Sequence, residues 1–200
     1  PEFTHDPHVW TDVKQADVQV FNIGAALEKT QSDNPAAADS IKAAVEKYEA
    51  QLTLLDQWVR DSISSVPEEN RVLFTSHDAF GYFANAYDVK FIGAALSDFN
   101  HQQDATAEHI NKAAEEVKAS GAKALFAENS NNSKSIEAIA RAAGVKAITN
   151  DDALYGDSLG PAGSPGETYI GSIIHNVTTL VTAWDGTPAP LPPEISNNAK

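Results

Sequence analysis

The sequence has 200 residues, 42% of them hydrophobic, which suits one large domain or two small ones with a real core. Its 28 Asp and Glu residues against 14 Lys and Arg give a net charge of −14, which argues against nucleic-acid binding and against adsorption to anionic membranes. The absence of cysteine excludes disulfides, thiolate metal sites and cysteine catalysis, and no apolar run is long enough to span a membrane.

Two long helices are predicted in the first third of the chain. Asp12 is a good N-cap for a helix over 12–30, with Val18 and Phe21 on its apolar side. An Asn-Pro pair then starts a second helix over 35–64, in which apolar residues recur at spacings of three and four. At 1.5 Å per residue this helix would be about 45 Å long. A helix of that length can join two lobes as a rigid spine.

An alternation of strands and helices follows from residue 71 onward. Short apolar runs predict the strands, and glycines close two of the helical segments between them. The strands are expected at 72–75, 89–93, 124–127 and 145–149, and the helices at 78–87, from Asp104 or Thr106 to 119, 134–143 and 168–184. This order indicates an α/β fold with a parallel four-stranded sheet flanked by helices. The proline-rich tail after residue 185 is expected to be an extended arm or disordered.

Three polar residues stand where such a sheet binds ligands. His77 follows the strand over 72–75, and open α/β sheets bind ligands just outside the carboxyl ends of their strands. His8 lies in HDPHVW, and Asp157 lies in a long glycine-rich loop over 150–166. Imidazole and carboxylate suit a transition metal such as zinc or manganese. The three are far apart in sequence, and from its position alone His77 would more often cap or pack a helix start.

The chain resembles the metal-specific solute-binding proteins of ABC transporters, the zinc and manganese group. The resemblance covers nearly all of residues 4–184, with the motifs in family order. It is carried by DPHVW at 6–10, the long helix, SHDAFGYF at 76–83, FAENS at 126–130 and LYGDSLG…GETYIGSIIHNV at 154–177.

The resemblance implies two α/β lobes joined by a rigid helix, with one metal ion between them. The corresponding divisions are a remnant of the N-terminal lobe at 1–34, the linking helix at 35–66, the C-terminal α/β lobe at 67–186 and a proline-rich tail at 187–200. The family's first metal ligand is a histidine that precedes the DPHxW motif, and His5 does not match that position. We therefore expect an N-terminally truncated form, and whether it binds metal stays open.

By motif, the resemblance places His8, His77 and Asp157 at ligand positions. A nitrogen-rich ligand set favours zinc, whereas sets richer in oxygen suit manganese, so we expect zinc first and manganese second. Asp78 and Glu128 are candidates for orienting the metal-bound rings.

The function implied is high-affinity capture of zinc or manganese as the solute-binding component of an ABC importer, without catalysis. Its partners would be the divalent metal ion and the transporter permease. The expected location is extracytoplasmic, in the periplasm or lipid-anchored at the cell surface, with signal and anchor outside this chain.

Two other readings stay open. The GDSL block at 156–159 is also seen in one class of serine esterases, with Ser158 as nucleophile. In those enzymes the block sits early in the domain and an Asp-x-x-His pair follows near the end, whereas here it is late and no such pair follows. A non-catalytic adhesion or partner-binding domain is compatible with the acidic surface and the proline-rich tail.

Overall fold

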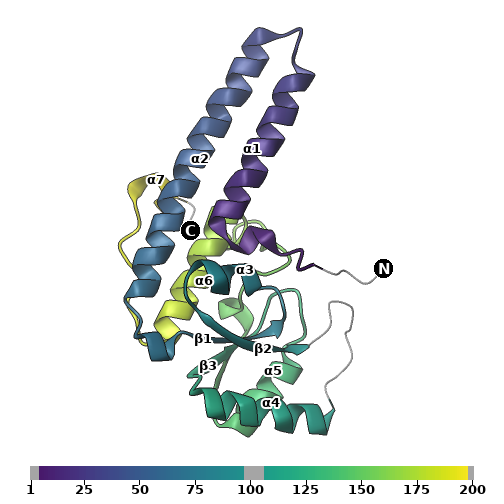
Figure 1. The fold of residues 1–200 in the computed structure, drawn as a ribbon, viewed down its shortest axis with the longest axis vertical. Coiled ribbons are helices and arrows are strands. Elements are labelled where there is room, and N and C mark those ends of the chain that lie inside the picture. The colour runs from purple at the N-terminus through teal and green to yellow at the C-terminus, as the bar shows by residue number, and fades with distance from the viewer. Residues whose placement is uncertain (1–4, 97–105, 198–200) are drawn as a thin grey trace.

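The computed structural model describes residues 5–96 and 106–197 (Figure 1), so the candidate cap Asp104 lies outside the described residues. The strands are β1 Val72–His77, β2 Lys90–Leu96, β3 Ala124–Phe126 and β4 Lys146–Ile148. The helices are α1 Val13–Thr30, α2 Pro35–Ser64, α3 Gly81–Ala86, α4 Ala107–Ser120, α5 Lys134–Ala143, α6 Tyr169–Ala183 and α7 Pro193–Ser196. None of these helices is both long enough and apolar enough to cross a bilayer.

The four strands form one parallel sheet in the order β2-β1-β3-β4, which confirms the predicted α/β fold. Its two faces are covered by different helices, because successive strand side chains point to opposite faces. Leu73 joins the buried cluster that α2, α3 and α6 complete, and its neighbour Phe74 joins the cluster of α4 and α5. The strand ends in the middle of the sheet are therefore held between two packed layers.

The first two helices form a hairpin that extends beyond the sheet (Figure 1). The predicted caps are confirmed, since the side chains of Asp12 and Asn34 accept hydrogen bonds from backbone N–H groups of the first helical turns. α1 packs closely on α2 at Gly24, where an added Cβ would lie 2.5 Å from Val45 Cγ2. The side chains of Val18 and Phe21, which were predicted on the apolar side of this helix, are exposed.

The region around His77 differs from the expected boundaries. β1 continues to His77, which is the last residue of the strand and does not lie beyond it. α3 begins at Gly81, three residues later than predicted, because the chain first turns with Ala79 N–H donating to His77 O. The turn leaves the His77 ring at the strand end, clear of the helix.

Of the two expectations for the tail, an extended arm or disorder, its described part agrees with the extended arm. The tail runs in extended form along α2 and ends in the short helix α7 (Figure 1). Trp58 Nε1 donates to Ala189 O at 2.8 Å, and Ala189 N donates to Ser62 Oγ at 3.0 Å. Ile195 is fully buried in the same cluster as α2. Tertiary contacts with the long helix thus order a segment whose composition is typical of disorder.

Candidate metal site

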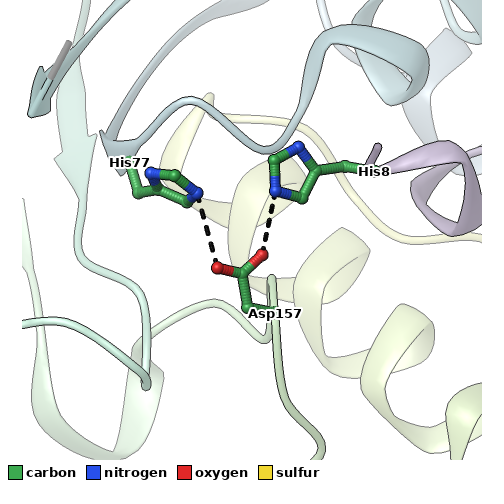
Figure 2. A group of neighbouring side chains, drawn as sticks. All are labelled: His8, His77 and Asp157. Atoms are coloured by element: carbon green, nitrogen blue, oxygen red, sulfur yellow. Dashed lines mark ion pairs between the residues drawn. The ribbon is translucent and has the colours of Figure 1, made fainter. Parts of the chain in front are cut away.

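His8, His77 and Asp157 converge at the carboxyl end of the sheet (Figure 2). Asp157 Oδ1 lies 3.1 Å from His8 Nε2, and Asp157 Oδ2 lies 3.4 Å from His77 Nε2. One nitrogen or oxygen atom from each residue lies within 4.8 Å of the others. Over residues 5–96 and 106–197 this is the one group of three or more His, Cys, Asp or Glu side chains close enough to hold a metal ion.

The His8 ring is oriented by Asp6. Asp6 Oδ1 accepts the His8 backbone N–H at 2.9 Å and lies 2.6 Å from His8 Nδ1. A carboxylate only accepts, so Asp6 favours a proton on Nδ1, which in the neutral ring leaves the Nε2 lone pair for a metal ion. The Nε2 atom points at Asp157 Oδ1, and a direct hydrogen bond between these two atoms would require a proton on Nε2 as well. Asp6 was not predicted for this role, although the Asp-Pro-His sequence places it two residues before the ring.

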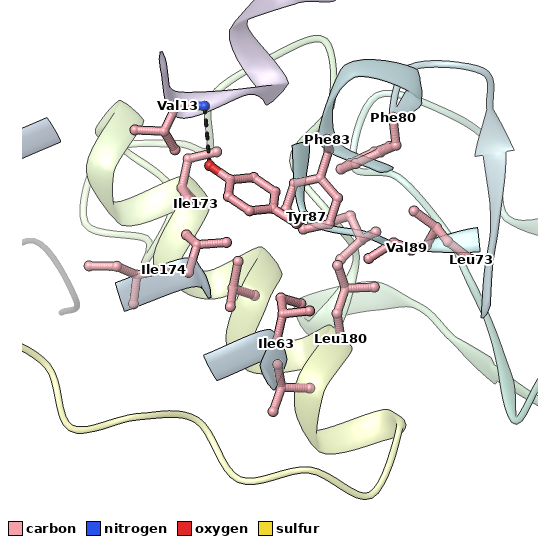
Figure 3. Packing of buried hydrophobic residues seen from close by; sticks show 14 of the residues in the cluster. Val13, Ile63, Leu73, Phe80, Phe83, Tyr87, Val89, Ile173, Ile174 and Leu180 are labelled. Carbon is pink, nitrogen blue, oxygen red and sulfur yellow. Dashed lines mark hydrogen bonds between the residues drawn. The ribbon is translucent and has the colours of Figure 1, made fainter. Parts of the chain in front are cut away.

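The segment that carries His8 is fastened to the sheet domain at three points. Trp10 Nε1 donates to Gly156 O at 3.0 Å, and Tyr169 Oη donates to Trp10 O at 2.8 Å. Val13 N donates to the Tyr87 hydroxyl at 3.4 Å inside the buried cluster (Figure 3). His8 is therefore held in place by contacts within the described residues.

His77 is held through its backbone. Its N–H donates to Glu128 Oε1 at 2.9 Å, and its carbonyl accepts from Thr75 Oγ1 at 2.6 Å. Glu128 follows β3 and is 1% exposed. Glu128 thus contacts the main chain of His77, whereas the sequence predicted that it would orient a ring.

Glu128 also lies against the Asp157 loop. A Cβ on Gly156 would be 2.3 Å from Glu128 Oε2, so the close approach requires glycine. Glu128 Oε2 is buried without a hydrogen-bond partner. Burial raises the pKa of Glu128 to about 8 against the opposing effect of the His77 N–H, and the charges of Asp157 and Asp78 add to the rise.

Asp78 lies beside the cluster. Burial and then the charge of Asp6 raise its pKa, while the rings of His77 and His8 lower it. It is electrostatically coupled to both rings. Its role in orienting them stays a prediction.

The Ser158 hydroxyl is engaged away from the cluster. Asn129 Nδ2 donates to Ser158 Oγ at 2.9 Å, and the pair lies in an exposed loop. An esterase nucleophile would need a histidine base aligned by an acid. His8 and His77 instead point their Nε2 atoms at Asp157 (Figure 2).

The arrangement suits a divalent cation. Two imidazole nitrogens and a carboxylate converge from the residue before a 3-10 turn, a strand end and a loop that are distant in sequence. The carboxylate lies between the two rings. A metal could replace these contacts with coordination by the same atoms, since zinc binds histidine nitrogen and carboxylate oxygen readily.

Comparisons with known proteins relate the chain to metal-binding proteins. The family described as zinc-uptake complex component A, periplasmic (ZnuA) matches residues 2–183. The manganese-binding lipoprotein MntA of Bacillus subtilis is 34% identical over 182 residues, which are 90% of this chain and 58% of the relative. The zinc-binding protein TroA of Treponema pallidum is 33% identical over 184 residues, 91% of this chain and 58% of TroA.

The fold agrees with a solved relative. The structure of periplasmic zinc-binding protein TroA from Treponema pallidum superposes with a TM-score of 0.76 and 33% identity, covering 90% of this chain and 64% of that one. The chain therefore spans less than two thirds of the length of each of these relatives.

Proposed function

The chain belongs to the ZnuA family of periplasmic zinc-uptake components, and from that premise we propose that it captures a divalent metal ion for an ABC importer. The observation that carries the proposal is the convergence of His8, His77 and Asp157, with ligand atoms within 4.8 Å of one another. In this proposal these three residues are the metal ligands.

Capture depends on charge and on preset geometry. Two neutral imidazoles and one carboxylate leave a bound divalent ion with one net positive charge from this set. Asp6 fixes the ring of His8, and the position of His77 at the end of β1 fixes its backbone. Little ordering is then needed when the ion arrives, which favours tight binding.

Zinc is the proposed first choice of metal and manganese the second. Two nitrogens and one oxygen form a ligand set that favours zinc, whereas manganese prefers sets richer in oxygen. The names of the relatives cover both metals, since MntA is called manganese-binding and TroA zinc-binding.

The proposal also has a location and a partner. The protein would act outside the cytoplasmic membrane, in the periplasm or lipid-anchored, and would hand the ion to a permease without a catalytic step. Residues 67–186 would be the C-terminal lobe, 35–66 the helix that links it to residues 1–34, and 187–200 a tail. Glu128 and Asp78 would support the ligands, Glu128 through the backbone of His77.

The test is competition titration of zinc and of manganese against a chromophoric chelator. We expect one zinc ion per chain, bound more tightly than manganese, and a large but still measurable fall in zinc affinity in His8→Ala, His77→Ala and Asp157→Ala. His109→Ala is the matched control, because this half-buried histidine contacts Ala95 O and lies outside the cluster.

Protons should compete with the metal for the imidazoles, so affinity should fall towards about pH 5. Equal affinity at neutral and acid pH would contradict the ligand set. No metal binding by the wild-type chain, or full binding by all three alanine variants, would refute the proposal.

A further inference from the structure

α6 carries a buried amide. Asn176 is 2% exposed and lies among Ile173, Val177 and Leu180, which belong to the main core cluster. A buried amide costs free energy unless its donor and acceptor are both paired. A leucine of similar size would pack there without needing hydrogen-bond partners, so the hydrogen bonds of this amide indicate a role beyond filling space.

Asn176 pairs with both backbone groups of one residue. Its Oδ1 accepts the Tyr155 N–H at 2.8 Å, and its Nδ2 donates to Tyr155 O at 2.8 Å. The side-chain amide thus makes the two hydrogen bonds to Tyr155 that a backbone peptide of a neighbouring strand would make. Tyr155 stands two residues before Asp157, where β-type pairing of the chain has just ended at the bridge between Leu154 and Glu128.

Each of the three residues before Asp157 is held by a hydrogen bond from or to another part of the chain. Leu154 N donates to Ala127 O at 2.8 Å, Asn176 holds Tyr155, and Trp10 donates to the carbonyl of Gly156. Asp157 itself is an exposed loop residue, and its carboxylate spans both histidines. Metal ligands on loops need such support, because their geometry must hold to about 0.5 Å.

We propose that Asn176 is a positioning residue for Asp157: it extends the order of the sheet past Leu154 and thereby sets where the carboxylate meets the two rings. The inference rests on the proposed function, in which Asp157 binds the metal. Asn176 acts through the Tyr155 backbone and does not touch the ion.

A double-mutant cycle tests this. Zinc affinity is measured by chelator competition for the wild type, Asn176→Leu, Asp157→Ala and the double variant. We expect Asn176→Leu to lower affinity about 10- to 100-fold in the wild type. In the Asp157→Ala background the same change should alter affinity by less than about threefold, since the residue it positions is already gone.

Two further variants separate positioning from folding. Asn176→Asp keeps the size and the acceptor but cannot donate to Tyr155 O in its charged form, so it should also weaken zinc binding. If circular dichroism of the metal-free protein shows that Asn176→Leu does not fold, Asn176→Asp replaces it in the test. Thr178→Ala, at an exposed position on the same helix, should bind as the wild type does. The visible spectrum of bound cobalt should shift in the Asn176 variants and not in Thr178→Ala.

The inference is overturned if folded Asn176 variants bind zinc as the wild type does, or if Asn176→Leu costs the same affinity with and without Asp157. Either result leaves the metal site itself intact. If the wild-type chain binds no zinc, the proposed function fails, and the positioning role fails with it.

Discussion

The ring of His8 is oriented by a charge only two residues away. Asp6 lies 2.6 Å from Nδ1 and accepts the backbone N–H as well. Carboxylates in this position fix the tautomer of a metal-binding histidine and make its other nitrogen a better ligand. The pair lies within one short segment, so its effect can be measured separately from the fold.

Asp6→Asn is expected to weaken zinc affinity about tenfold, because the amide removes the charge and can present an N–H to Nδ1. Competition titration measures the change. Asp33→Asn, the same substitution at an exposed position between α1 and α2, is the control. Unchanged affinity in Asp6→Asn would show that the ring needs no such partner.

Glu128 makes the stability of the metal-free chain depend on pH. Its pKa of about 8 in the folded state lies above the ordinary glutamate value, so the folded chain holds this proton more strongly than the unfolded chain. The stabilisation is complete below the ordinary glutamate range and is lost as pH rises through about 8.

In Glu128→Gln the side chain stays neutral at every pH. We expect the free energy of unfolding of the wild type to fall between about pH 5 and 8 relative to this variant, by up to about 1.4 kcal/mol per pH unit. Urea unfolding with a chelator present measures the difference. Parallel pH curves for the two proteins would mean that Glu128 ionises normally.

α7 and the extended tail pack along α2. Ile195 is fully buried, and the Trp58 indole holds the tail at Ala189. Ile195→Ala should therefore lower the free energy of unfolding by about 2–4 kcal/mol, the usual cost of such a cavity. Urea unfolding would show it, with Ser196→Ala as a neighbouring control. A change below about 0.5 kcal/mol would mean that the tail does not pack in solution.

Most helices and strands could be predicted because their signals are local. Gly121 and Gly144 adopt positive φ values after α4 and α5, and Asn34 caps α2. The packed tail could not be predicted, since its order comes from Trp58 and Ser62, more than a hundred residues earlier in the chain. Periodicity and composition contain no information about such contacts.

The whole chain combines a high negative charge with several exposed apolar side chains on α1. Val18, Phe21, Ile23 and Leu27 of α1 are 48–60% exposed on the projecting hairpin. Exposed apolar side chains promote association, while a net charge of −14 opposes it. Salt should shift the balance by screening the charge.

We expect the isolated chain to self-associate as salt and protein concentration rise, and Phe21→Ser to weaken this association. Sedimentation velocity at low and high salt measures it. Asn22→Ser, exposed on the same helix, is the control. A chain that stays monomeric in high salt at all concentrations would contradict the expectation.

The candidate ligands could be predicted only through the resemblance to a family. His8, His77 and Asp157 come from three separate parts of the chain, and no spacing rule links them. The residues that support them were harder to find. Asp6 and Asn176 were missed because their roles depend on hydrogen bonds to a ring and to a backbone that only the folded chain brings near.

Trp10 gives the site an optical reporter of its own. Its ring meets the His8 ring edge-on with centroids 5.4 Å apart, while Trp58 and Trp184 are buried in the core cluster. Indole emission responds to nearby charge and to unpaired electrons. Filling the site with closed-shell zinc should therefore change the intrinsic fluorescence differently from filling it with paramagnetic manganese. The fluorescence of the unlabelled protein could then distinguish bound zinc from bound manganese.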